Sequence, residues 1–318
     1  MGAPVPGLSL AIPGFLAGLA VGSFLATLVV RAPQGLPLSG RSRCDHCGAA
    51  LAIPDLLPLL SFLLRRGRCR RCGAPIDPVH PLLEVLGALV GALSLGLLGL
   101  PLGLAGALLG WTLLALAALD LRHFWLPDWL TLPLLAGGLA ATLLLHPARL
   151  PTQFAAAGLA GLTLWLVRAL FARLRGREGL GLGDVKLAAG LGAWLSPALL
   201  PPLLLLAALA GLALAAAVRL GRGQHGRQGR WPIVPFGACL AVAAWPTWLA
   251  SAATVGPEGI GQPVRLQAER LAKPTAEGQQ HGQRRNKNVK LRAQGTGGLG
   301  EAESARRSPA GKGKWANA

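Results

Sequence analysis

Residues 81–119 form a long apolar stretch in which no helix face would be polar. Comparable stretches recur along most of the 318-residue chain, and several reach the roughly 20 residues that a helix needs to span a bilayer. A large soluble helical protein would instead alternate apolar and polar positions around each helix. Only 14% of the residues are charged, whereas about 25% is usual in soluble domains. The sequence therefore predicts an all-α polytopic membrane protein.

Hydropathy divides these stretches into about eight transmembrane helices. The spans are expected near residues 8–30, 81–100, 102–121, 127–146, 152–172, 184–198, 199–218 and 232–253. Segment 184–198 is short and is also compatible with a re-entrant segment. Basic residues fall in every second connection, beginning with the arginine-rich segment 31–80. Because basic loops stay in the cytoplasm, we expect the N-terminus outside and this segment inside.

Four of the five cysteines form two CxxC pairs in the cytoplasmic segment. The sequence reads Cys44-Asp-His-Cys47, then 21 residues, then Cys69-Arg-Arg-Cys72. Two such pairs can present four thiolates tetrahedrally to a structural Zn²⁺, and metal binding would supply folding free energy that so short a segment lacks. A reducing compartment disfavours structural disulfides, and redox chemistry would need only one pair. We predict a small zinc-knuckle loop, with His46 as a less favoured substitute for one thiolate.

The formal net charge is +18. The basic residues that produce it lie between the apolar stretches and in the last part of the chain, rather than on one face. Contact with the lipid bilayer is therefore expected, and no nucleic-acid partner is expected. Residues 255–318 lack apolar periodicity and are rich in Gly, Gln, Ala and Arg, which is typical of disorder. A solvated appendage is favoured there over a tail that binds lipid or nucleic acid.

Carboxylates are scarce in the membrane region, where each one is costly and marks a candidate functional site. Three of the six aspartates, Asp120, Asp128 and Asp184, lie at the predicted cytoplasmic ends of spans. Two aspartates on separate helices can share a proton, so that one is the base and the other the acid around an attacking water. Gly181 and Gly183 would let a substrate strand approach the backbone beside Asp184. The pattern favours Asp120 and Asp184 as a catalytic pair.

Each of these aspartates also has a structural explanation. Asp128 follows a proline at a helix start, where capping or the helix dipole accounts for it best. Asp184 could be an N-cap. Asp120 stands at the unfavourable end of the helix dipole, so that pairing with Arg122 or His123 is its structural alternative.

Taken in order, the motifs of residues 14–250 resemble those of the prepilin peptidases, the bacterial type IV leader peptidases with a Gly-x-Gly-Asp motif. The matching segments are 22–31, the cysteine loop, 80–84, 120–128, Gly181-Leu-Gly183-Asp184-Val-Lys186 and 232–237. Gly-x-Gly-Asp alone would be a weak signal, whereas the ordered set is specific. The chain departs from the family pattern at Ala238, where a proline is usual.

The resemblance implies that Asp120 and Asp184 are the catalytic pair. The supporting positions around the substrate would be Gly181, Gly183, Lys186 and Asp128. Substrates would be prepilins or pseudopilins, cut at the cytoplasmic face of the bacterial inner membrane. Members with the cysteine loop commonly also methylate the new N-terminus with S-adenosylmethionine.

The resulting organisation has four parts. They are a first transmembrane helix over 1–30, a cytoplasmic four-cysteine zinc loop over 31–80, a transmembrane aspartic peptidase core over 81–254 and a basic disordered tail over 255–318.

Two other classes of protein fit parts of the pattern. A membrane transporter or channel would use the carboxylates to couple protons or cations, and it predicts internal repeats and broken spans, which the sequence does not show. A membrane scaffold with a zinc loop and no catalysis would leave Asp120 and Asp184 without a chemical role.

Overall fold

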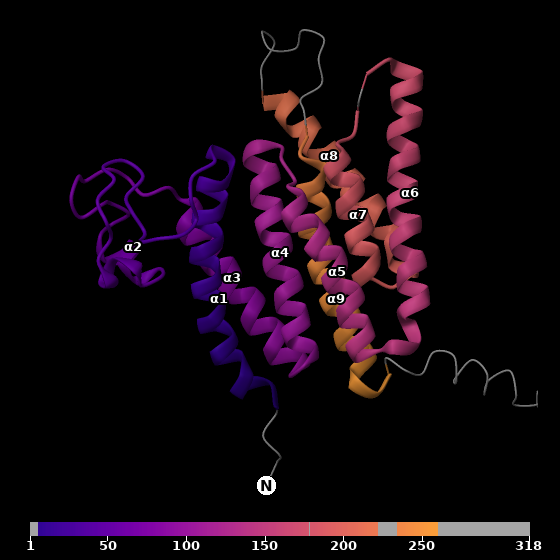
Figure 1. Ribbon diagram of the computed structural model, residues 1–318, viewed down its shortest axis with the longest axis horizontal. Coiled ribbons are helices and arrows are strands. Elements are labelled where there is room, and N and C mark those ends of the chain that lie inside the picture. Colours follow the sequence, from indigo (N-terminus) through magenta and orange to yellow (C-terminus); the bar gives the residue numbers. More distant parts are fainter. Residues whose placement is uncertain (1–5, 178, 222–233, 260–318) are drawn as a thin grey trace, which may run out of the picture. The chain divides into compact units, whose positions relative to one another are not determined.

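The computed structural model describes residues 6–177, 179–221 and 234–259, and these are mostly helical (Figure 1). The helices are α1 (Pro6–Arg31), α2 (Leu60–Leu64), α3 (Val79–Leu98), α4 (Leu102–His123), α5 (Asp128–Leu145), α6 (Leu150–Arg175), α7 (Leu182–Trp194), α8 (Leu200–Gly221) and α9 (Phe236–Gly259). The chain divides into two units after Ile260, and all described residues belong to the first. The predicted tail, 255–318, lies outside the described residues except for 255–259, which end α9.

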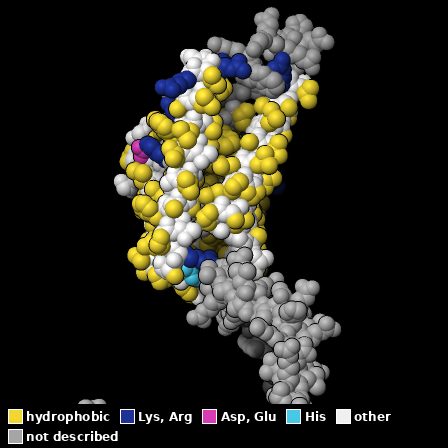
Figure 2. Space-filling view, turned by 90° about the vertical axis from the view of Figure 1, so that its right-hand side faces the viewer, with side chains coloured by type: hydrophobic (Ala, Val, Ile, Leu, Met, Phe, Trp, Pro, Cys, Tyr) yellow, Lys and Arg dark blue, Asp and Glu magenta, His cyan; other side chains and the backbone are white. Residues whose placement is uncertain are grey.

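Seven helices of the described part are long and apolar enough to cross a membrane. They are α1, α3, α4, α5, α6, α8 and α9. Figure 2 shows one face of the molecule, which is largely hydrophobic, with Lys and Arg side chains gathered mainly toward the upper end. Most of the exposed large hydrophobic residues of the described part are leucines, which suits contact with lipid tails.

The remaining predicted span, 184–198, forms only the short helix α7 of 13 residues. At 1.5 Å per residue this helix reaches about 20 Å, which is short of the roughly 30 Å hydrocarbon core. It stops because Leu195 is extended ahead of Pro197. The side-chain amide of Gln153 in α6 donates to the carbonyl oxygens of Ala193 and Leu195 at 3.3 and 3.2 Å. The sixth predicted span, 184–198, is therefore a short helix whose last carbonyl groups accept hydrogen bonds from α6.

Helices α1 and α3 pack closely through glycines. A Cβ atom on Gly18 would lie 2.2 Å from the carbonyl oxygen of Gly87, and one on Gly14 would lie 2.4 Å from that of Gly91. A Cβ on Gly22 would lie 2.3 Å from the carbonyl oxygen of Leu83. Small residues allow such backbone contact between membrane helices. This packing places the end of α1 beside the start of α3.

Two partly buried tryptophans connect α7 to α5 and α9 to α4. The indole N–H of Trp194 in α7 donates to the carbonyl oxygen of Leu134 in α5 at 2.8 Å. That of Trp245 in α9 donates to Gly106 of α4 at 3.0 Å. An indole N–H without a partner is costly away from water, so these bonds favour one arrangement of the four helices.

Candidate active site and cysteine cluster

Asp120 lies in the last turn of α4 with 6% of its surface exposed. Its Oδ2 accepts the backbone N–H of Ala238 at 2.7 Å, in the first turn of α9. The first turn of a helix presents unpaired N–H groups and the positive end of the dipole, so it stabilises a carboxylate. Arg122, a predicted alternative partner of Asp120, instead pairs with Asp77.

Asp184 lies in the first turn of α7 and is 9% exposed. Its Oδ2 accepts the backbone N–H of Gly181 at 3.2 Å, so this carboxylate does satisfy the start of its helix. The capping bond uses one oxygen only. The other oxygen, Oδ1, faces Gly237 of α9.

Gly237 brings the two carboxylates together. A Cβ atom at this position would lie 2.9 Å from Oδ1 of Asp184 and 3.0 Å from Oδ2 of Asp120. Both oxygens therefore border the same small space, which a side chain at position 237 would fill. The structure thus brings together the ends of α4, α7 and α9 at two buried carboxylates.

The supporting residues lie around this pair in different ways. A Cβ on Gly183 would lie 2.7 Å from Cβ of Leu126, so the close approach at this glycine is to the α4–α5 connection. Lys186 of α7 and Asp128 of α5 form an ion pair at 2.6 Å, and both side chains are exposed. Asp128 makes no side-chain cap, because Pro127 occupies the N-cap position. It lies in the first turn of α5, where the helix dipole favours it.

The two CxxC knuckles of the segment between α1 and α3 have matching local structure. In each, the N–H of a glycine returns to the carbonyl oxygen of the first cysteine, from Gly48 to Cys44 at 2.8 Å and from Gly73 to Cys69 at 3.0 Å. Gly48 and Gly73 have φ values of 66° and 71°, which a side chain would strain. The repeated turn aims both pairs of sulfurs at one point.

The Sγ atoms of four cysteines all lie within 4.8 Å of one another. These residues are Cys44, Cys47, Cys69 and Cys72. The Sγ atoms of Cys44 and Cys72 are 3.9 Å apart, close to the ~3.8 Å edge of a tetrahedron with Zn–S bonds of about 2.3 Å. Backbone N–H groups of Cys72 and Arg71 lower the pKa of the Cys69 thiol to about 6. Four sulfurs this close cannot all ionise without a cation between them, so the donor set fits zinc.

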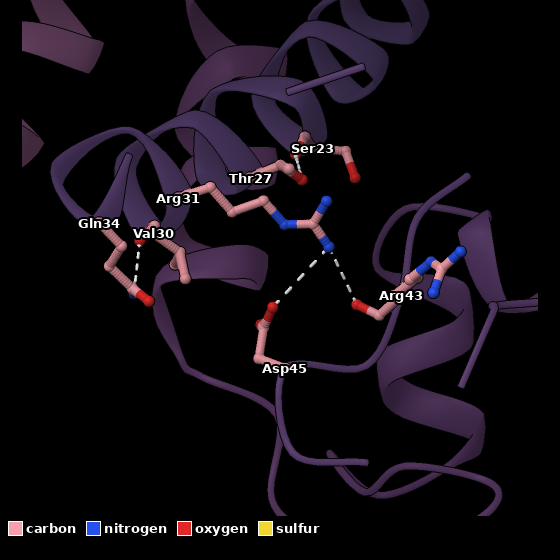
Figure 3. Close-up of polar contacts among 7 residues, drawn as sticks. All are labelled: Ser23, Thr27, Val30, Arg31, Gln34, Arg43 and Asp45. Carbon is pink, nitrogen blue, oxygen red and sulfur yellow. Dashed lines mark hydrogen bonds and ion pairs between the residues drawn. The ribbon is translucent and has the colours of Figure 1, made fainter. Parts of the chain in front are cut away.

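A cavity of about 560 Å³, which the sequence did not predict, lies between the cysteine loop and the ends of three helices. Ser23, Thr27 and Arg31 line it from one face of α1. Figure 3 shows Arg31 reaching from the helix end into the loop, where it contacts Asp45 at 3.8 Å and the carbonyl oxygen of Arg43 at 3.1 Å. Ser23, Thr27 and Arg31 are four residues apart, which places three polar groups on one face of the helix. This spacing was the sequence signal that could have indicated the cavity.

Two acidic residues complete the wall of the cavity. Glu84 of α3 is 6% exposed and accepts the N–H of Leu59 at 2.8 Å; it makes no ion pair within the described residues. Asp77 pairs with Arg122 at 2.7 Å, which joins the loop to the end of α4. Burial would raise the pKa of Asp77, but the N–H of Val79 and the Arg122 guanidinium outweigh it and lower that pKa. The basic loop and the Asp120 end of α4 therefore lie at the same end of the helices.

Replacement of Cys44 by serine is expected to lower the zinc content of the purified chain, because a hydroxyl is a much poorer zinc ligand than a thiolate. Elemental analysis of protein purified in detergent measures this directly. Cys239→Ser is the matched control, since Cys239 lies in α9 outside the cluster and its loss should leave one zinc per chain. Equal zinc in both variants would contradict the four-cysteine site.

Comparison with known proteins adds independent information. The model of the bacterial peptidase A24 N-terminal domain matches residues 16–96, and that of the type IV leader peptidase family matches residues 107–216. A protein named prepilin leader peptidase/N-methyltransferase from Burkholderia pseudomallei (strain K96243) is 40% identical over 258 residues, covering 72% of this chain and 82% of that protein.

Proteins of the same name from two other bacteria match at comparable identity. That of Aeromonas hydrophila is 44% identical over 206 residues, covering 64% of this chain and 70% of that protein. That of Dickeya chrysanthemi is 41% identical over 257 residues, covering 72% and 88%. No solved structure matches the chain. The domain matches and the coverage of these relatives show that the chain belongs to the type IV leader peptidase family.

Proposed function

We propose that the chain is a prepilin leader peptidase whose catalytic pair is Asp120 and Asp184. The observation that carries this proposal is the pair of buried carboxylates that border the same space at Gly237. The names of the relatives supply prepilins as the substrate class, and we extend the proposal to pseudopilins. The family match favours this function over a transporter or a non-catalytic scaffold.

The proposed reaction is acid–base hydrolysis by a water held between the two carboxylates. Asp120, which accepts the N–H of Ala238, remains charged and accepts the proton of the water. Asp184 carries a proton on Oδ1, polarises the scissile carbonyl and later donates to the leaving amine. No acyl-enzyme forms, because the attacking group is water.

Cleavage takes place at the cytoplasmic face of the bacterial inner membrane in this proposal. The ion pair of Asp77 with Arg122 supports it, because it joins the Asp120 end of α4 to the arginine-rich loop. Gly181 and Gly183 hold the start of α7, and the Lys186–Asp128 ion pair joins α7 to α5. These four residues support the catalytic pair and do not transfer protons.

Asp120→Asn and Asp184→Asn should each reduce cleavage of a co-expressed prepilin by about 10²–10⁴-fold, because each removes one partner of the proton transfer. Mass spectrometry of the prepilin N-terminus measures the cleaved fraction. Zinc content and the unfolding temperature in detergent serve as folding controls, and both should match the unsubstituted chain. Normal processing by either variant would exclude the pair.

Gly237→Ala should also abolish most cleavage, because its Cβ would lie about 3 Å from both carboxylates and displace the water between them. The matched control is Gly137→Ala in α5, where the nearest atom to a Cβ is 3.5 Å away in Trp194, an ordinary contact. Cleavage rates of the two variants are compared at equal expression. Equal rates would show that the space at Gly237 is not used.

We further propose that the cavity beside the cysteine loop holds S-adenosylmethionine for methylation of the new N-terminus. The relatives' names include this activity, and the cavity falls in the size range of sites for small molecules. Bound there, the donor would supply an electrophilic methyl group to the amine. Glu84 supplies a buried negative charge without an ion-pair partner in the described part, which suits a cationic ligand. Zinc is structural in this proposal and holds the loop that forms the outer wall.

Glu84→Gln tests this assignment. Glutamine keeps an oxygen for the N–H of Leu59 and removes only the charge, so the loop should stay folded. Affinity for S-adenosylhomocysteine, measured by calorimetry on the detergent-purified chain, should fall by about tenfold or more, because a charged contact contributes roughly 1.5–3 kcal/mol. Prepilin cleavage should persist. Unchanged affinity would place the donor elsewhere and leave the peptidase proposal intact.

A further inference from the structure

The segment 56–64 of the cysteine loop exposes an unusual amount of apolar surface. We call it the leucine segment; it reads Leu-Leu-Pro-Leu-Leu-Ser-Phe-Leu-Leu and includes α2. Leu63 and Leu64 are 70% and 75% exposed, and Leu56, Leu57 and Leu60 are exposed as well. A soluble loop rarely presents so many large apolar side chains to water without a partner.

The side chains of this segment point in two directions. Ser61, Phe62 and Leu56 line the cavity beside the loop, and Phe62 lies 3.0 Å from where a Cβ of Gly67 would be. Leu63 and Leu64 do not line the cavity and remain uncovered. The inner face of the segment therefore lines the cavity and packs against the loop, whereas the outer face has no partner within the described residues.

One hydrogen bond fixes the position of the leucine segment along the membrane-spanning helix α3. The backbone N–H of Leu59 donates to Oε2 of Glu84 at 2.8 Å, and Glu84 is the sixth residue of the membrane-spanning helix α3. At 1.5 Å per residue, Glu84 lies about 7.5 Å along α3 from its start. In Figure 1, α2 is drawn at the level of the upper half of α1, rather than above its upper end.

The surroundings at this depth match a bilayer interface. Leu82 and Val85, on either side of Glu84 in α3, are exposed as lipid-facing residues are. Arg66, two residues after the segment, is exposed, whereas Arg65 pairs with Asp55 and lines the cavity. An exposed basic residue beside an inserted apolar surface extends toward anionic headgroups and strengthens the attachment.

From these observations we infer that the outer face of the leucine segment inserts into the cytoplasmic interface of the bilayer. The lipid, rather than a second protein, covers Leu57, Leu60, Leu63 and Leu64. The segment thus holds the zinc loop and its cavity against the membrane at the depth of Glu84. This inference rests on the membrane fold and does not require the proposed catalytic pair.

The test places an environment-sensitive fluorescent amino acid at position 63 of the full chain by codon suppression, because the zinc cysteines exclude thiol labelling. The protein is reconstituted in vesicles of phosphatidylethanolamine and phosphatidylglycerol, with or without lipids brominated along the acyl chains. Leu209 of α8, an exposed residue of a span, gives the lipid reference, and His46 of the first knuckle gives the water reference. Zinc content confirms that each labelled loop is folded.

Emission at position 63 should shift to the blue and lose intensity in brominated lipid, approaching the values at position 209. Emission and quenching equal to those at position 46 would overturn the inference and leave the segment as a site for a protein partner. The double variant Leu63→Ser/Leu64→Ser, which adds no charge beside the cleavage site, gives a second readout. Trypsin should cut after the exposed Arg66 faster in this variant than in the unsubstituted chain, and equal rates would count against insertion.

Discussion

Two carboxylates are buried together at the ends of membrane helices, and the positions of three helices follow from their need for hydrogen-bond donors. A buried carboxylate without donors is strongly destabilising. Asp120 receives the N–H of Ala238 from α9, and Asp184 receives that of Gly181 before α7. Because Gly237 has no side chain, both acids can border one space. The end of α4 and the starts of α7 and α9 must therefore meet at one point.

The same requirement explains why α7 does not cross the membrane. Its first turn must lie at the acidic pair, and its last carbonyl groups are satisfied by Gln153 of α6. Trp194, its last residue, bonds to the backbone of α5. A helix held at both ends by its neighbours does not need to reach the far headgroups, because its polar backbone groups are satisfied within the protein.

Local features were predictable from the sequence, and backbone features were not. The apolar stretches and the two CxxC pairs carry their own signals, and the scarcity of carboxylates singled out Asp120 and Asp184. The length of α7 was not predictable, because hydropathy does not distinguish contact with lipid from contact with other helices. The Ala238 N–H has no side-chain signature. The face of Ser23, Thr27 and Arg31 did have helical spacing, but the apolar residues between them masked it.

The two proposed activities occupy opposite faces of one helix end. Asp120 faces α9, whereas Arg122, two residues later, lines the cavity beside the cysteine loop. Two residues turn an α-helix by about 200° and advance it by about 3 Å, so the sites are at similar depth on different faces. A new N-terminus released at the acidic pair therefore has to pass around the end of α4 to reach the methyl donor. Cleavage has to precede methylation because the amine is free only after the peptide bond is cut, and the Asp77–Arg122 ion pair holds the loop at the helix end where the proposed cut is made.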